Sequence, residues 1–292
     1  MGGNSRQVLR RRIRGIREAA KVTKAMELIA STRMRRAEQR AVNARPYATG
    51  LGELMTITLN RANVGADNPL FVRPDDGLAL IVHFTTDKGL CGGLNLRLNH
   101  SLARFVADEQ MPVRVVTVGR KGRDFVLRVG LGLIAEFTEL GDGPGIAELR
   151  PLCRLVTEMF TRGEVDRAYL CYPQFISVMT QRPVVERMLP VAPVESGEEG
   201  SRDVLLEPGP AVILEHLLVR YVEASVYHAY LELVASEHSA RMVAMHSATE
   251  SATELAETMS DDLNRSRQAA VTEEICDVSA ASEALSHGAG YE

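Results

Sequence analysis

Two glycine-rich stretches of the sequence have the residue types that phosphate binding requires. The first is Asp87-Lys88-Gly89-Leu90-Cys91-Gly92-Gly93-Leu94-Asn95, and the second is Gly119-Arg120-Lys121-Gly122; each follows an apolar run and precedes a helical pattern. Backbone amides at such a helix start can bind phosphate oxygens. Neither stretch matches G-x-G-x-x-G or G-x-x-x-x-G-K-[ST], and tight backbone packing needs glycines at these turns just as often. We therefore expect structural turns and no bound cofactor.

Histidine and cysteine give no pattern of a reactive site. The seven histidines lack metal-ligand spacing, and His238 and His246, two helical turns apart, have no evident third ligand. The four cysteines form no C-x-x-C pair, which argues against a zinc ribbon or a redox dithiol. The sequence therefore predicts no catalytic residue and no metal site.

Both ends of the chain are predicted to form long helices that must position everything else. Apolar residues recur at alternating intervals of four and three from Leu9 to Met55, and again from Leu217 to Ala270. This spacing is typical of a coiled coil, and the alanines and methionines on both seams favour a close, left-handed approach. Because Pro46 lacks a backbone donor, we expect a bend or a helix end there.

Between these helices the pattern changes to alternating strands and helices. Residues 78–84, 113–118 and 167–172 read as strands, and residues 94–108, 119–129 and 146–162 read as helices. This alternation predicts a small α/β domain with a parallel sheet. Residues 174–192 are predicted to add a further extended pair, and residues 195–203 a surface loop. The predicted divisions are 1–58 for the N-terminal helix, 76–193 for the α/β domain and 208–287 for the C-terminal helix.

The distribution of charge leaves two classes of function open. The net charge is −4, yet residues 1–45 hold 13 Lys and Arg against 3 Asp and Glu. A basic helix attracts an acidic protein surface and a phosphate backbone alike, so the chain is either a mechanical interaction protein or a basic coiled-coil nucleic-acid-binding protein. The absence of Trp and the low aromatic content, 5%, argue against the second class. No apolar run reaches the roughly 18 residues of a membrane span, so membrane contact is expected only through partners.

Four sequence blocks resemble the γ subunit of F-type ATP synthases, and together they extend over nearly the whole chain. The first block runs from Val22-Thr23-Lys24-Ala25-Met26-Glu27 to Arg33-Met34-Arg35-Arg36, and Ala44-Arg45-Pro46-Tyr47-Ala48 extends it. The other three are residues 86–95, residues 235–245 and Arg267-Gln268-Ala269-Ala270-Val271-Thr272-Glu273-Glu274-Ile275. The motifs near the two ends are highly specific.

The resemblance implies a noncatalytic rotor shaft that couples proton or sodium flow to ATP synthesis or hydrolysis in a ring of α and β subunits. It also implies the fold: an α/β protein in which the terminal helices form a long antiparallel two-helix coiled coil with an inserted Rossmann-like α/β domain. The implied partners are the α, β and ε subunits and the c-ring, with no nucleic acid and no direct membrane insertion. The implied location is the cytoplasmic face of the bacterial inner membrane, peripheral through the complex.

The same resemblance implies which residues contact partners. Acidic loops of the β subunits would meet Lys24, Arg33, Arg35 and Arg36 near Met26, with Arg241 on the returning helix. Near the C-terminal tip, Arg267, Gln268 and Thr272 match positions where the family's shaft forms hydrogen bonds with a loop of β. The family's glycine-rich block is a structural turn, in agreement with the role expected above for residues 89–93.

Overall fold

The computed structural model describes residues 2–62, 77–109, 112–143, 145–191 and 209–288. The chain forms two compact units. Unit 1 consists of residues 1–28 and 245–292, and unit 2 of residues 29–244. Two long helices, α1 (Gly2–Ala62) and α5 (Pro210–Gly288), contribute residues to both units. The loop predicted at residues 195–203 lies outside the described residues.

Unit 1 is an antiparallel pair of helices. Arg17 donates to the Ser260 hydroxyl at 3.2 Å, and the Thr23 and Thr249 hydroxyls lie 2.7 Å apart. Because residue numbers rise along one helix as they fall along the other, the helices run in opposite directions. The seam residues that the heptad pattern predicted for this part of α1 are all buried or half-buried: Leu9, Ile13, Ile16, Ala20, Thr23 and Glu27. The coiled coil expected from the sequence is confirmed.

In unit 2 the seam of α1 continues with small and apolar residues. Its buried members are Ala30, Met34, Ala37, Ala41, Leu51 and Met55. The helix end predicted as one alternative at Pro46 is wrong, because α1 continues to Ala62. Pro46 and Val42, whose carbonyl loses its helical donor, lie on the exposed side of the helix. Water can therefore take the place of the missing N–H, while burial of Leu51 and Met55 favours continued helix.

The remainder of unit 2 is an α/β domain inserted between the two helices. Its elements are β1 (Ala79–Phe84), α2 (Leu94–Asp108), β2 (Val113–Val118), α3 (Arg120–Val129), β3 (Gly132–Phe137), α4 (Ile146–Thr161), β4 (Arg167–Phe175) and β5 (Gln181–Leu189). The strand order is β3-β2-β1-β4-β5, with β5 antiparallel to β4 and the other neighbours parallel. This is a doubly wound topology. The strand order runs outward from β1 to β3 on one side and from β4 to β5 on the other, so the order switches between the parallel strands β1 and β4.

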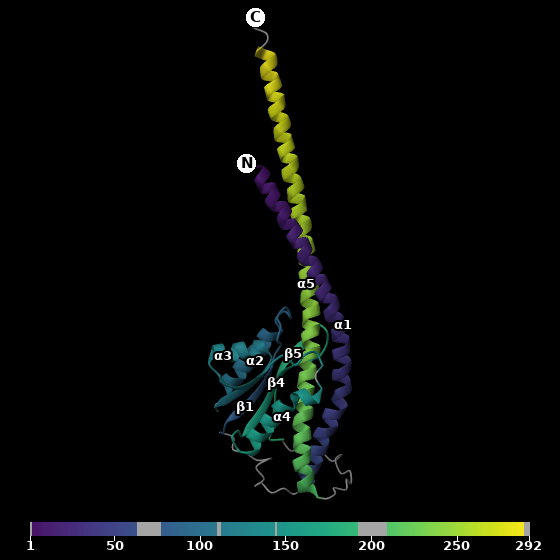
Figure 1. The fold of residues 1–292 in the computed structure, drawn as a ribbon, viewed down its shortest axis with the longest axis vertical. Helices are drawn as coiled ribbons and strands as arrows, with labels where there is room; N and C mark the ends of the chain where they lie inside the picture. The colour runs from purple at the N-terminus through teal and green to yellow at the C-terminus, as the bar shows by residue number, and fades with distance from the viewer. Residues whose placement is uncertain (1, 63–76, 110–111, 144, 192–208, 289–292) are drawn as a thin grey trace. The chain divides into compact units, whose positions relative to one another are not determined.

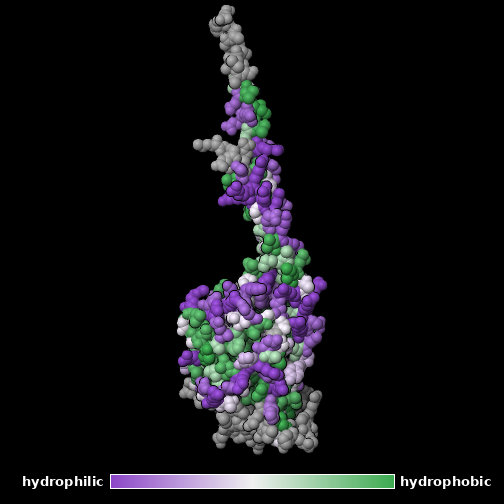
Figure 2. All heavy atoms as spheres, viewed as in Figure 1, coloured by the Kyte–Doolittle hydropathy of each residue, from purple (hydrophilic) through white to green (hydrophobic). Residues whose placement is uncertain are grey.

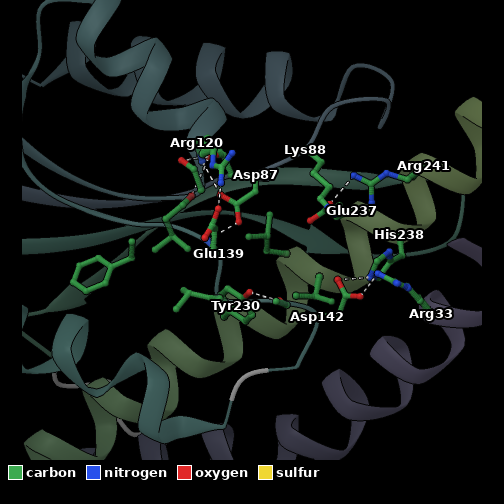
Figure 3. A pocket seen from close by; sticks show the side chains of 18 residues that line it. Arg33, Asp87, Lys88, Arg120, Glu139, Asp142, Tyr230, Glu237, His238 and Arg241 are labelled. Carbon is green, nitrogen blue, oxygen red and sulfur yellow. Dashed lines mark hydrogen bonds and ion pairs between the residues drawn. The ribbon is translucent and has the colours of Figure 1, made fainter. Parts of the chain in front are cut away.

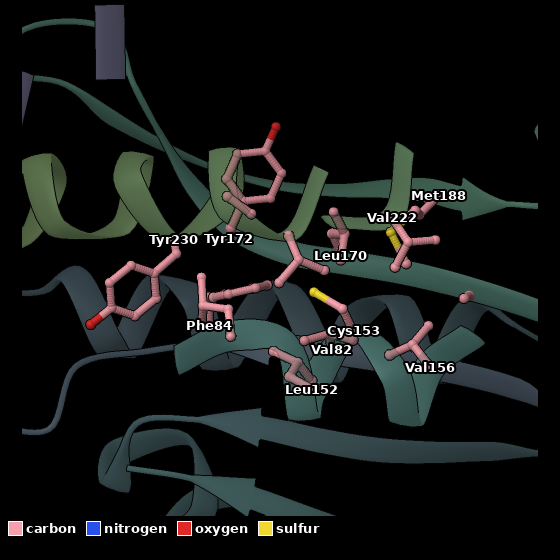
Figure 4. Packing of buried hydrophobic residues seen from close by; sticks show 14 of the residues in the cluster. Val82, Phe84, Leu152, Cys153, Val156, Leu170, Tyr172, Met188, Val222 and Tyr230 are labelled. Carbon is pink, nitrogen blue, oxygen red and sulfur yellow. The ribbon is translucent and has the colours of Figure 1, made fainter. Parts of the chain in front are cut away.

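Helices cover both faces of the sheet (Figure 1). One face carries Ile81 and Tyr169 and packs against α2 and α3. The other face carries Val82 and Phe84 and packs against α4 and α5 in the largest apolar cluster (Figure 4). The strands β1 and β2 are therefore buried on both sides, which explains why they read in the sequence as continuous apolar runs.

The predicted strands and helices of this domain are confirmed, with one omission. No clear sequence signal marks β3, because this edge strand is half-exposed, with burial alternating only weakly along Gly132–Phe137. The extended pair predicted over residues 174–192 corresponds to the end of β4 and to β5. Within the described ranges, no helix is long and apolar enough to cross a membrane.

Candidate functional site

A cleft of about 360 Å³ opens at the carboxyl ends of β1, β2 and β3 (Figure 3). In doubly wound sheets this edge is where ligands bind, so the cleft is the first place to test the phosphate hypothesis. Residues of α1 and α5 close it on the side opposite the strands. Its charged side chains balance in number: Arg33, Lys88, Arg120 and Arg241 against Asp87, Glu139, Asp142 and Glu237.

A carboxylate of the chain itself occupies the helix start at which a phosphate would bind. Asp87 Oδ1 accepts a hydrogen bond of 3.1 Å from the backbone amide of Arg120, which is the first residue of α3. Its Oδ2 accepts the Glu139 amide at 2.9 Å, which joins the ends of β1 and β3. The Arg120 guanidinium is in turn paired with the Glu139 carboxylate. The partial positive charge of the helix start is thus compensated internally, which favours a structural turn over a phosphate site.

The second glycine-rich stretch packs too tightly for side chains. Gly119 has a φ of +92°, and a Cβ there would overlap the Thr85 carbonyl oxygen. A Cβ on Gly122 would lie 2.7 Å from Thr85 Oγ1, the atom that accepts the Gly122 amide at 2.7 Å. Both glycines therefore permit close contact between the start of α3 and the end of β1.

The first glycine-rich stretch is held by a small buried network and by α5. Asn95 donates to Thr86 Oγ1 at 2.8 Å, and the Thr86 amide donates back to Asn95 Oδ1 at 3.1 Å. Asn95 also donates to Cys91 Sγ at 3.2 Å, and burial raises the pKa of this thiol. Gly92 has a φ of +56°, a conformation that other residues adopt with strain. These hydrogen bonds and the conformation of Gly92 show that the first glycine-rich stretch is a structural turn.

Arg241, one of the predicted partner contacts, has two partners within the chain. Its guanidinium donates to the Gly89 carbonyl at 3.2 Å and to Glu237 Oε1 at 2.6 Å. Burial raises the pKa of Glu237, and Arg241 opposes that rise. Only 11% of the Arg241 side chain is exposed, so its first role in this chain is to join α5 to the glycine-rich loop.

The other predicted contact residues of unit 2 are exposed on α1. Arg33, Arg35 and Arg36 all present exposed side chains. Arg33 differs from its neighbours because it also lines the cleft and pairs with Asp142, so it lies close to Arg241 at the same site (Figure 3).

Unit 1 holds the remaining predicted contact residues. Lys24 is exposed and pairs at 3.1 Å with Glu27, whose pKa it lowers, and Met26 is half-buried. The three tip residues Arg267, Gln268 and Thr272 are exposed, and the Thr272 hydroxyl donates to the Gln268 carbonyl at 2.9 Å.

Apolar side chains are also exposed near the tip, where Figure 2 shows hydrophobic residues on the last coloured part of α5. They include Val271, Ile275 and Val278, of which Val278 is 65% exposed. From residue 264 to residue 280, every residue except Ala270 is exposed. This stretch of helix therefore offers apolar as well as polar side chains to a partner.

Reactive groups are sparse in the part of the chain that the structure describes. Within it, no group of three or more His, Cys, Asp or Glu is arranged to hold a metal ion. The described thiols are free, with Cys91, Cys153 and Cys171 buried and Cys276 exposed.

Two acidic residues that the sequence interpretation missed lie where the α/β domain meets the helices. Asp142 contacts Arg33 of α1 and His238 of α5, and Glu232 accepts hydrogen bonds from Arg45 at 3.0 Å and from the Phe175 amide at 2.7 Å. The available signals were the turn sequence Gly141-Asp142-Gly143 and a glutamate within a strongly apolar stretch of α5.

Comparisons with known proteins agree with one another. The family described as ATP synthase matches residues 5–285. The ATP synthase gamma chain of Dehalococcoides mccartyi strain 195 is 39% identical over 280 residues, covering 96% of this chain and 98% of the relative. That of Roseiflexus sp. RS-1 is 40% identical over 286 residues, with the same coverage.

Solved structures share the fold. A chain of the Euglena gracilis mitochondrial ATP synthase (OSCP/F1/c-ring, rotational state 3) superimposes with a TM-score of 0.67 at 17% identity, covering 99% of this chain and 97% of its own length. A chain of the Tetrahymena thermophila mitochondrial ATP synthase central stalk/c-ring gives 0.62 at 23% identity, with 78% and 99% coverage. The nucleic-acid-binding alternative finds no support in any of these matches. A family match over nearly the full length, together with relatives of about 40% identity, shows that the chain belongs to the ATP synthase gamma chain family.

Proposed function

We propose that the chain is the noncatalytic rotor shaft of the central stalk, coupling ion flow through a membrane ring to ATP synthesis or hydrolysis in a ring of α and β subunits. The observation that carries this proposal is the exposed stretch 264–280 of α5, which presents Val271 and Ile275 beside polar residues. Val271, Ile275 and Val278 are spaced four and three residues apart, so they form an exposed apolar stripe along one side of the helix, which favours contact with another subunit over exposure to water.

Charge complementarity supports contact between α1 and acidic loops of the β subunits. The side chains of Lys24, Arg35 and Arg36 are exposed and do not belong to the buried apolar core. Exposed ion pairs contribute only about 0 to 1 kcal/mol each and are screened by salt, so losses on substitution should be graded. Arg33 is a less selective probe, because its substitution would also remove the contact with Asp142.

The tip residues have a more directional role in the proposal. Arg267 and Gln268 carry donors that can form several hydrogen bonds with one loop, and Thr272 is one turn further along the same helix. We assign to these three residues the hydrogen bonds with a loop of β.

The α/β domain, residues 76–193, is proposed to contact the ε subunit and the c-ring without binding a nucleotide. Asp87 supports the second part of the proposal, because its carboxylate already accepts the amide at the start of α3. The divisions 1–58 and 208–287 form the shaft. The complex would hold the chain at the cytoplasmic face of a bacterial inner membrane, peripherally through its partners.

The test is the ATP synthase complex reconstituted into vesicles with Arg267→Ala and Gln268→Ala together. ATP hydrolysis and ion pumping are measured on the same preparation, and Arg265→Ala, another exposed arginine of the same helix, is the matched control. The double variant should lower pumping more than hydrolysis, whereas the control should change neither. Normal pumping by the double variant, combined with loss of hydrolysis in Lys24→Ala, would contradict the assigned roles.

A further inference from the structure

The loop between β3 and α4 is fastened to both long helices at one residue, Asp142. Its Oδ2 atom pairs with Arg33 Nη1 of α1, and its Oδ1 atom lies 3.2 Å from His238 Nε2 of α5 (Figure 3). Its carbonyl oxygen accepts a hydrogen bond from Arg40 Nη1, also of α1, at 3.3 Å. The preceding residue, Gly141, accepts the Tyr230 hydroxyl of α5 at 2.5 Å. Two adjacent residues of one loop thus engage two side chains from each helix.

The sequence around Asp142 is suited to this position. Gly141 has a φ of +79°, which residues with a side chain adopt only under strain, and it turns the loop toward the helices. A Cβ on Gly143 would overlap the Arg40 guanidinium, so the second glycine leaves the space through which Arg40 reaches the loop. In the turn Gly141-Asp142-Gly143, the first glycine therefore serves the contact with α5 and the second the contact with α1.

Apolar packing alone would join the domain to the helices less specifically. The sheet packs on α5 through a large apolar cluster, whereas, of the α1 side chains that the structure describes, only Ala37 and Met55 are buried members of that cluster. Apolar burial is non-directional, so it resists separation better than it resists sliding. Charge-assisted hydrogen bonds have preferred geometries and fix one arrangement. The loop supplies one such bond to α1, between Asp142 and Arg33, and a neutral hydrogen bond to α5, from the Tyr230 hydroxyl to the Gly141 carbonyl.

We infer that Asp142 is a positioning residue for rotary coupling, which holds the α/β domain in one orientation about the two shaft helices so that torque passes between them without slip. This inference rests on the proposed rotor function. Without the carboxylate, the Arg33 and His238 contacts are lost together, and the domain can shift about the helices under load. The effect should therefore appear when the rotor works against an opposing ion gradient and be small in its absence.

The experiment uses the complete ATP synthase complex carrying Asp142→Ala, reconstituted into vesicles. The matched control is Asp124→Ala, an exposed carboxylate of α3 that pairs with Arg123 of the same helix. ATP hydrolysis, and ions pumped per ATP hydrolysed, are measured with and without an imposed opposing gradient. Because only directional contacts are removed, hydrolysis should stay within about twofold of wild type, while ions pumped per ATP against the gradient should fall at least about twofold. The control should match wild type.

Conservative variants separate positioning from a general structural defect. Asp142→Glu keeps the charge and should recover most of the pumping against the gradient, whereas Asp142→Asn, which keeps the shape without the charge, should recover less. If Asp142→Ala does not assemble, the Asn and Glu variants carry the test. Equal pumping against the gradient by the Asn variant and by wild type would overturn the inference. Failure of the proposed function would look different, because the wild-type chain would then not assemble with α and β subunits.

Discussion

His83 should make the folded chain sensitive to acid through a single buried ring. It lies on β1 with no exposed surface, and its Nε2 atom is 2.9 Å from Asn99 Oδ1. Its Nδ1 atom is buried without a hydrogen-bond partner, so a proton added there would be a buried, unpaired donor. Burial lowers the pKa of His83 from 6.5 to about 4, and the bond to Asn99 opposes this only in part.

The change in the free energy of unfolding with pH follows from the number of protons that the folded and unfolded chains bind at His83. As the pH falls, the unfolded chain protonates His83 near pH 6.5, while the folded chain does so only near pH 4. Between these values the unfolded state binds more protons, so the free energy of unfolding decreases by about 1.4 kcal/mol per pH unit. The total loss attributable to His83 is about 3 kcal/mol, and above pH 6.5 the residue contributes no pH dependence.

Urea unfolding of the full-length chain, from about pH 7.5 to about pH 4.5, measures this loss. The comparison is His83→Gln, which can still donate to Asn99 but does not titrate. The difference in free energy of unfolding between the two proteins should stay constant above pH 6.5 and should then change by about 1.4 kcal/mol per unit below it. His100→Gln, an exposed histidine of α2, is the control and should leave the profile unchanged. A difference between wild type and the His83→Gln variant that does not vary with pH would refute the reasoning.

Two further substitutions test the turn and the seam. Gly119→Ala places a Cβ against the Thr85 carbonyl at a positive φ and should reduce the free energy of unfolding by several kcal/mol in urea, whereas Gly89→Ala, with open space around it, should be nearly neutral. Equal stability of the two variants would contradict the tight packing of α3 on β1. Met245→Asp buries an unpaired charge in the seam of unit 1 and should weaken helix pairing, measured as loss of helical circular dichroism at lower temperature. Leu255→Asp, at a position that is 50% exposed, should melt like wild type; if both melt alike, the seam assignment fails.

Periodic features of the fold could be predicted from the sequence alone. The heptad spacing located the seam because burial on one side of a helix repeats along it, and the runs at 78–84 and 113–118 indicated the central strands because both faces of these strands are covered. Edge strand β3 was not predicted from the sequence, because its side chains are only partly buried on both faces of the sheet. The helix end offered as one alternative at Pro46 does not occur, because packing of the surrounding seam overrides the local preference.

The contacts at the cleft could not be predicted in the same way. Arg33 and Asp142 are 109 residues apart in the sequence, and neither side chain belongs to a repeating pattern. Arg241 was assigned to a partner from its match to the family, yet its contacts to Glu237 and Gly89 depend on where the glycine-rich loop packs against α5. A contact between two single polar residues on distant elements produces no periodic pattern in the sequence, so it cannot be predicted from periodicity.

The alanines of the seam have a consequence for the thickness of the molecule that the α and β subunits would surround. The distance between two packed helix axes depends on the side chains between them, and Ala30, Ala37 and Ala41 are among the smallest available. A larger side chain at any of these positions would push the axes apart and widen the shaft at that level. Their small size therefore limits the width of the helix pair, and with it the diameter of any opening formed by surrounding subunits. None of these alanines needs to contact those subunits to have this effect.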